Sequence, residues 1–483
     1  MVLSFAYTRS LLPLAQVYTG RFPWTNIELH KKHGPVVRIA PNEYSIDDPS
    51  AVKAIYGHGT AFTKGPWYDG STNLKDQKSN LFADRDPESH AAERRKVASL
   101  YSMSTLVTME EGVNDCIALL EQRLGELTRS RKPINLQWWM QCYAFDVIGS
   151  ITISKRFGFL DSGEDPMDLT SGMDDFLIHS ARIGVYPELH PIIFKLGKWA
   201  GPNGIIRAFI FTRKEIHEYK ATNKFLEGKI DEEAAFLPRL LRLHQAKPDS
   251  VTEEDVMRTC AINIVAGSDT TSISLTGVLW ALLRNPEAME KVLFIPSPRW
   301  VRGLTFTINQ LRAEVDDKYL SGEIGDPISF ADAQKMPYLQ AVIREGLRLH
   351  PAGGLPLSRV VPKGGATIAG HFFPEGTIVG INAWVAHRNA DVFGDDVEVF
   401  RPERWLEDEK NAHRMERYWL PFGHGSRTCL GKNMALMEIS KLIPQLIRKF
   451  DIELADPEMK LETRNVWFVK QTNIIVQIKQ RTL

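Results

Sequence analysis

Short apolar runs separated by turn residues characterise the first hundred residues, and helical periodicity characterises most of the remaining chain. Alternating apolar positions predict a hairpin of two strands, Val36–Ala40 and Glu43–Ile46. From Asp86 onward, apolar residues recur every three or four positions, as in 116–127, which is typical of helices with one buried face. We therefore predict a small sheet in the N-terminal part and a helical body after it.

The longest apolar run, Ala261–Leu283, is predicted to form a helix buried in the protein core. Its length would suffice for a membrane span, but Asp269 lies in its middle within a polar cluster, and an ionisable residue is costly in lipid. Upstream, Thr252 and Asp255 have the spacing of an N-terminal capping box. We expect the helix to begin there.

The C-terminal third mixes strands and helices. Strand-like runs lie within 366–383, a helix is predicted over 432–450, and 473–479 is predicted to be a strand. No repeat or Ser/Gly-rich linker divides the chain. We therefore predict one domain, 1–483, that is mainly α with small β-sheets near both ends.

Composition excludes several classes of protein. The 59 Lys and Arg residues balance the 59 Asp and Glu residues, whereas a general nucleic-acid-binding protein has a basic excess. Hydrophobic residues make up 43% of the chain, which is enough for a large core. The four cysteines are too few for a disulfide scaffold, and none forms a Cys-x-x-Cys pair, which argues against structural zinc. Three of them are predicted to be small core residues: Cys116, Cys142 and Cys260.

One segment, Val292–Gln310, interrupts a helical pattern. It contains two prolines, a glycine and two arginines but no acidic residue. Without it, Leu311 and Val315 would follow Met289 by three and seven positions, on one helical face. Its first residue, Val, has a GT codon and its last, Gln, can have the codon CAG, so we hypothesise a short retained intron translated in frame. A genuine surface loop is the alternative.

Membrane-directed signals are weak. Arg9 and Pro13 interrupt the mildly apolar segment 1–18, which is too short for a spanning helix. The apolar stretch 192–211 could rest on a membrane surface without crossing it.

The strongest chemical signal is the segment Phe422–Gly431, which contains Cys429. Gly425 and Gly431 allow a tight loop whose N–H groups approach the sulfur. A helix is predicted to begin directly after this loop, and its positive end would favour a thiolate at Cys429. Arg427, two residues before the cysteine, could pair with a carboxylate of a bound cofactor.

This segment resembles the haem-binding loop of the cytochromes P450, Phe-x-x-Gly-x-Arg-x-Cys-x-Gly, at every fixed position. The resemblance implies the cytochrome P450 fold and haem b as cofactor. It implies Cys429 as the iron ligand, with haem-binding roles for Phe422, Gly425, Arg427 and Gly431. A thiolate ligand donates electron density that favours cleavage of the O–O bond.

Two further segments are similar to family motifs. Glu345 and Arg348 match the Glu-x-x-Arg of a helix, and Arg404 matches the arginine that completes an ion triad with them. The resemblance implies a structural role, since removal of one partner would leave the others buried and unpaired. Asp269 and Thr270 match the oxygen-activating turn, where an acid and an alcohol pass protons through ordered water.

A fourth match concerns the carboxylates of the haem. His90 and Arg94 lie one helical turn apart, so both could face one carboxylate, and Arg359 resembles a further arginine with that role. Plain surface positions are the alternative for these residues.

The implied reaction is monooxygenation, in which one oxygen atom of O2 enters a lipophilic substrate and the other becomes water. Electrons would come from NADPH through NADPH–cytochrome P450 reductase, docked on basic residues near Cys429. The basic candidates are Arg94, Arg95, Lys96 and Lys432. The implied location is the cytosolic face of the endoplasmic reticulum membrane. Microsomal relatives begin with an anchor that this sequence lacks, and three alternatives stay open: an incomplete gene model, a trimmed chain or a soluble form.

Substrate-facing positions follow from the resemblance alone. They are mostly apolar or aromatic, which suits a lipophilic substrate, and core packing is the alternative for each. Segments 62–64 and 99–102 resemble filamentous-fungal members of the pisatin demethylase type, which implies a secondary metabolite as substrate. The candidates are Phe62, Trp67, Tyr68, Ile262, Val265, Leu355, Leu357, Val466, Trp467 and Phe468.

Two other functions stay open. A haem-thiolate isomerase or dehydratase would need no oxygen, although such enzymes often lose the acid–alcohol pair that this chain retains. A non-enzymatic haem protein, either a gas sensor or a non-functional product caused by segment 292–310, belongs to a different class.

Overall fold

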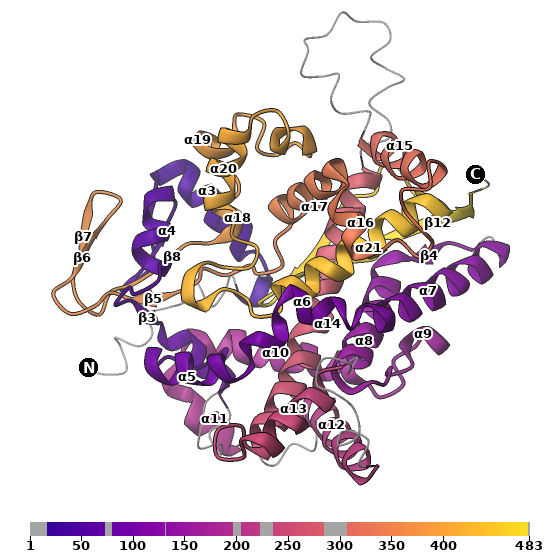
Figure 1. Cartoon of the computed structure of the whole chain (residues 1–483). Coiled ribbons are helices and arrows are strands. Elements are labelled where there is room, and N and C mark those ends of the chain that lie inside the picture. Colours follow the sequence, from indigo (N-terminus) through magenta and orange to yellow (C-terminus); the bar gives the residue numbers. More distant parts are fainter. Residues whose placement is uncertain are drawn as a thin grey trace, which may run out of the picture.

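The computed structural model describes residues 17–72, 80–130, 132–196, 204–222, 235–284 and 307–481. Helices predominate over small sheets (Figure 1), which confirms the predicted fold class. The helices of the first half are α3 (Phe22–His33), α4 (Pro49–Tyr56), α5 (Pro87–Val97), α6 (Met103–Val107), α7 (Glu110–Ser130), α8 (Leu136–Ile153), α9 (Phe159–Ser162), α10 (Leu169–Val185), α11 (His190–Leu196), α12 (Gly204–Ala221), α13 (Phe236–Ala246) and α14 (Glu253–Leu283).

The remaining helices and the strands come mainly from the second half. The helices are α15 (Thr307–Leu320), α16 (Phe330–Gln334), α17 (Pro337–Leu349), α18 (Ala383–Ala386), α19 (Ala390–Phe393), α20 (Glu409–Tyr418) and α21 (Lys432–Lys449). The strands are β1 (Val36–Ala40), β2 (Glu43–Ile46), β3 (Thr63–Lys64), β4 (Ile134–Asn135), β5 (Arg359–Val360), β6 (Ala366–Ile368), β7 (His371–Phe373), β8 (Ile378–Gly380), β9 (Phe450–Leu454), β10 (Glu462–Asn465), β11 (Val469–Thr472) and β12 (Ile475–Gln480).

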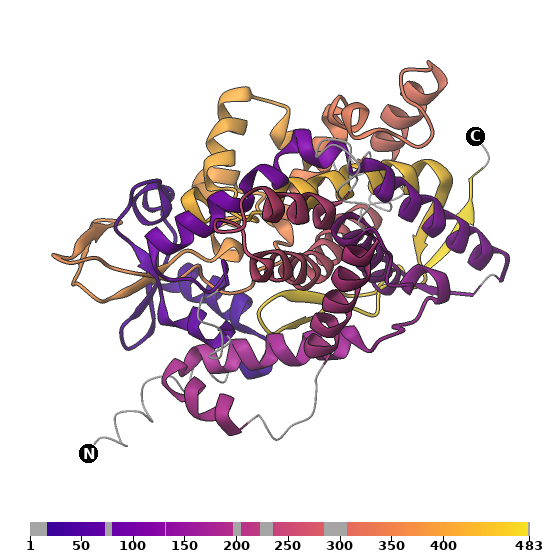
Figure 2. The same cartoon turned by 60° about the horizontal axis from the view of Figure 1, so that its bottom comes forward.

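Helix α14 runs through the middle of the helical body (Figure 1 and Figure 2). The predicted capping box is present, because the Thr252 and Asp255 side chains each accept the other's backbone N–H. At Gly267 of this helix a Cβ would lie 2.7 Å from Cδ1 of Ile148 on α8, so the absence of a side chain lets the two helices pack closely.

The core confirms that α14 is a buried helix. The largest apolar cluster surrounds α8, α14 and α21, and it contains three cysteines without exposed surface, Cys116, Cys142 and Cys260. Among the described helices, none combines the length and the apolar character that a membrane crossing requires.

A smaller sheet lobe lies at one side of the helical body, away from the C-terminal strand β12 (Figure 1). Its sheet has the order β1-β2-β8-β5-β3, and its first two strands form the predicted hairpin. A second hairpin, β6–β7, turns at Ala369 and Gly370, both with positive φ, at a position that no local pattern predicted. Across β3 and β5 the register places Lys64 directly opposite Arg359.

The C-terminal strands hold the last part of the chain against the helices. β12 pairs with β4 and β9, which confirms the predicted terminal strand. Hairpin β10–β11 is separate from that sheet, and its strand β11 approaches α14 through the Gln471 side chain, which donates to the Ile273 carbonyl at 2.9 Å.

The predicted insert falls mostly outside the described residues, which resume at 307. Its last four positions, 307–310, form the first turn of α15. Ile308, Leu311 and Val315 are all buried, because their spacing of three and four places them on one helical face. The buried face of this helix therefore begins before the predicted boundary.

Candidate functional site

Cys429 lies in a tight loop between α20 and α21. Its backbone N–H donates to the Phe422 carbonyl at 2.8 Å, and the N–H of Thr428 donates to the Gly425 carbonyl at 3.0 Å. Gly425 has a φ of +68°, and a Cβ there would lie 1.7 Å from the Tyr56 carbonyl oxygen. Only glycine fits that position. Gly431 differs from the expectation, because its φ is −81° and a Cβ would meet no protein atom within 4 Å.

The Cys429 thiol is exposed although many protein atoms surround it. Burial raises the pKa of this thiol. The backbone N–H groups of Gly431 and Lys432, together with the charge of Arg94, act in the opposite direction. These donors stand at the start of α21, as the sequence predicted. A sulfur that is accessible and faces N–H donors is suited to bind a metal ion as a thiolate, since coordination removes the thiol proton.

A buried ion cluster lies on α17 and on the segment after α19. Glu345 accepts from the Arg348 guanidinium at 2.8 and 2.9 Å and from Nε of Arg404 at 2.8 Å. Trp405 Nε1 and the Arg401 N–H also donate to this carboxylate, at 2.9 and 3.0 Å. Burial alone would raise the pKa of Glu345, but Arg348 and Arg404 outweigh it and hold the pKa below its usual value. The structure thus brings the three predicted partners together.

Thr270 faces an accessible side of α14, whereas Asp269 does not. The Thr270 hydroxyl donates to the Ala266 carbonyl at 2.7 Å, and Ala266 is exposed although it lies in the middle of this helix. Asp269 is 2% exposed and accepts from Gln141 of α8 at 2.5 Å. The two neighbours therefore point to different surroundings, and no hydrogen bond joins their side chains in the described part of the chain.

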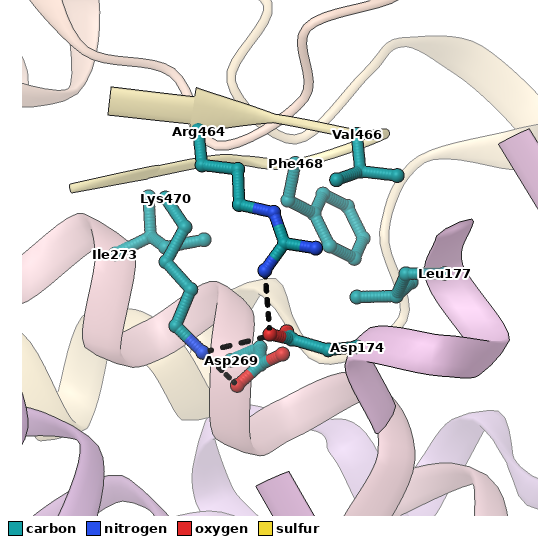
Figure 3. Close-up of a pocket in the computed structure, with 8 residues that line it drawn as sticks. All are labelled: Asp174, Leu177, Asp269, Ile273, Arg464, Val466, Phe468 and Lys470. Atoms are coloured by element: carbon teal, nitrogen blue, oxygen red, sulfur yellow. Dashed lines mark hydrogen bonds and ion pairs between the residues drawn. The ribbon is translucent and has the colours of Figure 1, made fainter. Parts of the chain in front are cut away.

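The Asp269 carboxylate belongs to a charged cluster beneath hairpin β10–β11 (Figure 3). The Lys470 ammonium lies between two carboxylates, with its nitrogen 3.6 Å from an oxygen of Asp269 and 3.7 Å from an oxygen of Asp174 on α10. A guanidinium nitrogen of Arg464 is 3.2 Å from the other oxygen of Asp174. Burial raises the pKa of Asp269, while Lys470 lowers it. Val466 and Phe468 line the same pocket, which opens between α10, α14 and the hairpin.

A group of cations gathers near the Cys429 loop. Burial and four cationic side chains, led by Arg427 and Lys64, lower the pKa of His90 to about 3; the other two are Arg94 and Arg359. Arg427 donates to the Asp84 carbonyl at 2.6 Å and Arg94 donates to the Thr428 carbonyl at 2.9 Å. His90 and Arg359 are buried rather than plain surface residues.

Comparison with known proteins identifies the family. The model of the family Cytochrome P450 matches residues 11–293 and 307–478. The chain belongs to the cytochrome P450 family. The unmatched residues 294–306 lie within the predicted insert.

Sequence similarity to fungal proteins covers nearly the whole length of this cytochrome P450. It is 37% identical to pisatin demethylase of Fusarium vanettenii over 94% of this chain and 83% of that protein. It is 35% identical to a cytochrome P450 monooxygenase of Aspergillus terreus, over 91% and 89% of the two chains. A cytochrome P450 monooxygenase of Emericella nidulans is 34% identical over 96% and 90%. These similarities confirm the predicted enzyme class, a cytochrome P450 monooxygenase.

Cytochromes P450 bind haem, and the residues near Cys429 fit that group. Haem carries two carboxylates besides its iron. Within the described residues, Lys64, Arg94, Arg359 and Arg427 form no ion pair with any carboxylate, so this cluster has positive charge to offer. Buried cations without anionic partners are unfavourable. The accessible sulfur and the excess of cations are therefore the donor set that an iron porphyrin requires.

The cytochrome P450 has fewer free basic residues on this side than the sequence indicated. Lys96 was expected to contact an acidic partner, but its ammonium lies 2.9 Å from Glu93 and 3.1 Å from Asp255. Its charge is neutralised within the protein. Arg95 remains exposed, and Lys432 is half-buried.

The candidate substrate residues divide into separate groups. Trp67, Trp467 and Phe468 belong to an aromatic cluster, with ring centroids 4.8 Å apart for Trp67 and Trp467 and 5.2 Å for Trp467 and Phe468. Phe62 and Leu357 pack against the core of the sheet lobe instead. Tyr68 is buried, with its ring centroid 5.4 Å from that of Trp67. Three further candidates are half-buried: Val265 packs against the main core, Ile262 lines a pocket near α5, and Leu355 lies before β5.

Several residues of this site were not foreseen. Gln141 is a polar residue in the apolar helix α8, which was an available signal for a buried partner. Lys470 and Asp174 contact Asp269 from positions far away in the sequence, so no local pattern indicates them. Lys64 lies within the family-like segment 62–64, but its partner Arg359 became evident only from the strand register.

Proposed function

We propose that this cytochrome P450 inserts one oxygen atom of O2 into a lipophilic fungal secondary metabolite, with NADPH as the electron source. The observation that carries the proposal is the accessible Cys429 sulfur with two backbone N–H groups directed at it. Haem bound through this sulfur supplies the oxidising chemistry. Phe422, Gly425, Arg427 and Gly431 shape the loop around it, and His90, Arg94 and Arg359 face its carboxylates.

Asp269 and Thr270 are proposed to deliver protons to oxygen. The raised pKa of Asp269 lets its carboxyl keep a proton to a higher pH than an exposed aspartate, which suits a proton donor. Thr270 presents its hydroxyl on the accessible side of α14. Asp269 would reach it after loosening its contacts with Gln141 and Lys470.

The proposed substrate site lies between α14 and the aromatic cluster. This cluster offers broad apolar ring surfaces from Trp67, Phe82, Trp467 and Phe468. The ring centroids of Phe82 and Trp467 are 4.7 Å apart. Aromatic surfaces of this kind favour a flat, lipophilic molecule. We place Val265 and Leu355 at the same site, and Phe62 and Leu357 in a supporting position behind it.

Electron supply is proposed to come from NADPH–cytochrome P450 reductase. Arg95 and Lys432 remain as basic contacts near the Cys429 loop for an acidic partner surface. Location at the cytosolic face of the endoplasmic reticulum agrees with an apolar surface on neighbouring segments. Its exposed residues are Leu189, Ile192 and Ile193 near α11 and Phe209 and Ile210 on α12.

Turnover with isotopically labelled O2 tests this function. The purified chain, reductase and NADPH are incubated with panels of fungal aromatic and terpenoid metabolites, and products are measured by mass spectrometry. We expect a product that carries one labelled oxygen atom, with NADPH consumed in step with product formation. The Cys429→Ala variant is the control and should form no product. A product that forms equally without O2 would contradict the proposal and favour an isomerase or dehydratase.

A further inference from the structure

Lys64 is a buried cation that faces another buried cation. It ends strand β3, and the antiparallel register places it directly opposite Arg359 on β5. Each residue is only 5% exposed. Like charges opposite each other on a sheet are destabilising, and burial strengthens their repulsion. An anion nearby would stabilise such a pair, whereas without one burial and the charge of Arg359 lower the pKa of Lys64.

The Lys64 ammonium has too few partners of its own. Its Nζ donates to the Phe82 carbonyl and lies over the rings of Tyr68 and Phe82, 4.5 and 4.8 Å from their centroids. An ammonium has three N–H donors, and among the described residues this carbonyl is its one oxygen acceptor. The aromatic faces attract the charge without supplying an anion.

Nearby arginines increase the positive charge on the same side. Arg359 and Arg427 both repel Lys64, and Arg427 stands two residues before Cys429. Asp84 is the carboxylate that attracts Lys64, but no ion pair within 4 Å joins the two in the described chain. The Arg359 guanidinium donates to the Ser358 carbonyl at 2.9 Å and lies over the Tyr56 ring. Both side chains therefore keep unused donors near the Cys429 loop.

We propose that Lys64, together with Arg359, binds one of the two carboxylates of the haem. A carboxylate between the two side chains would turn their repulsion into two charge-assisted hydrogen bonds. Lys64 would then be a cofactor-binding residue contributed by the sheet lobe. Its contacts with the rings of Tyr68 and Phe82 would connect it to the aromatic cluster of the proposed substrate site. This proposal rests on the proposed function, because it requires haem held through Cys429.

Haem release from Lys64→Met, measured with two forms of haem, tests the proposal. Wild type and variant are loaded with haem or with haem dimethyl ester, whose carboxylates carry no charge, and release to excess apomyoglobin is followed by absorbance. With haem, we expect the variant to release it about 10- to 100-fold faster than wild type. With the ester, the two proteins should release the group at the same rate. Lys64→Arg should behave like wild type, and Lys53→Met, at an exposed position on α4, controls for loss of one charge.

Three results would overturn the proposal. Equal haem release from wild type and Lys64→Met would show that Lys64 does not bind the carboxylate. The same acceleration with haem and with the ester would show that Lys64 acts through packing alone. Absence of a thiolate band from the reduced, carbon-monoxide-bound spectrum of wild type would contradict the proposed function itself. As a check on folding, the haem-free Lys64→Met protein should resist urea at least as well as haem-free wild type, since it loses an unpaired buried cation.

Discussion

Replacement of Glu345 by Gln should lower the free energy of unfolding more than a substitution at an exposed position does. The carboxylate has five N–H donors directed at it within 3.0 Å, three on Oε1 and two on Oε2. A Gln amide can accept on its oxygen alone. Even in its better orientation, its NH2 group would face the two donors of the Oε2 side, Arg348 Nε and Trp405 Nε1.

The size of the loss follows from those contacts. Each hydrogen bond to a charged group contributes about 1.5–3 kcal/mol, so two lost bonds amount to roughly 3–6 kcal/mol. Removing one partner of a buried ion pair gives a similar figure, about 3–5 kcal/mol. Whole domains are stable by about 5–15 kcal/mol, so the variant should lose a large share of its stability.

Urea unfolding followed by tryptophan fluorescence measures this loss. The exposed Glu458→Gln variant is the control and should change the free energy of unfolding by less than about 0.5 kcal/mol. The lowered pKa of Glu345 means that its contribution is present above the pKa of an unfolded glutamate, about 4.3, and disappears as pH falls through the lower folded value. The gap between wild type and variant should therefore narrow in acid. A loss of less than about 1 kcal/mol at neutral pH would show that these five hydrogen bonds do not hold the folded chain together.

Three other changes have defined outcomes. Gly425→Ala should prevent haem loading, because its Cβ would lie 1.7 Å from the Tyr56 carbonyl oxygen. The control, Gly431→Ala, should leave the urea midpoint of the haem-free protein unchanged, because its Cβ would meet no protein atom within 4 Å. Equal haem content in the Gly425→Ala variant and in wild type would contradict the first expectation. Asp269→Asn should slow product formation by about 100-fold or more. The variant should resist urea at neutral pH as well as wild type, because the raised pKa means that ionised Asp269 is less favourable in the folded chain than in the unfolded one. A marked loss of stability would be the contrary result. We propose that 292–310 is a retained intron in a single-domain chain, so properly spliced transcripts should lack these codons, and spliced reads that keep them would be evidence for a genuine loop.

Local patterns were sufficient to predict several elements of the fold. The β1–β2 hairpin, the capping box at Thr252 and helix α21 depend on short-range rules, namely alternation, capping and helical spacing. The turn at Ala369 and Gly370 was missed because Ala rarely adopts positive φ, so the sequence carried no turn signal beyond a single glycine. The start of α15 was missed because Ile308 was assigned to the insert.

The site was harder to predict, because its contacts join residues distant in sequence. The motif around Cys429 fixed the position of the sulfur, yet its exposed surface emerged only from the packing of other segments. Asp269 was placed beside Thr270, but helix geometry turns adjacent side chains about 100° apart, so Asp269 faces Lys470 and Gln141. Lys96 was assigned to a partner surface, and the capping residue Asp255 takes its charge instead.

The most direct test of Cys429 as the iron ligand is the reduced, carbon-monoxide-bound difference spectrum of the purified chain beside that of its Cys429→Ser variant. We predict a red-shifted thiolate Soret band in the wild type and loss of that band in the variant. A haem-loaded wild type without the band, or a variant that keeps it, would contradict the assignment of Cys429 as the iron ligand.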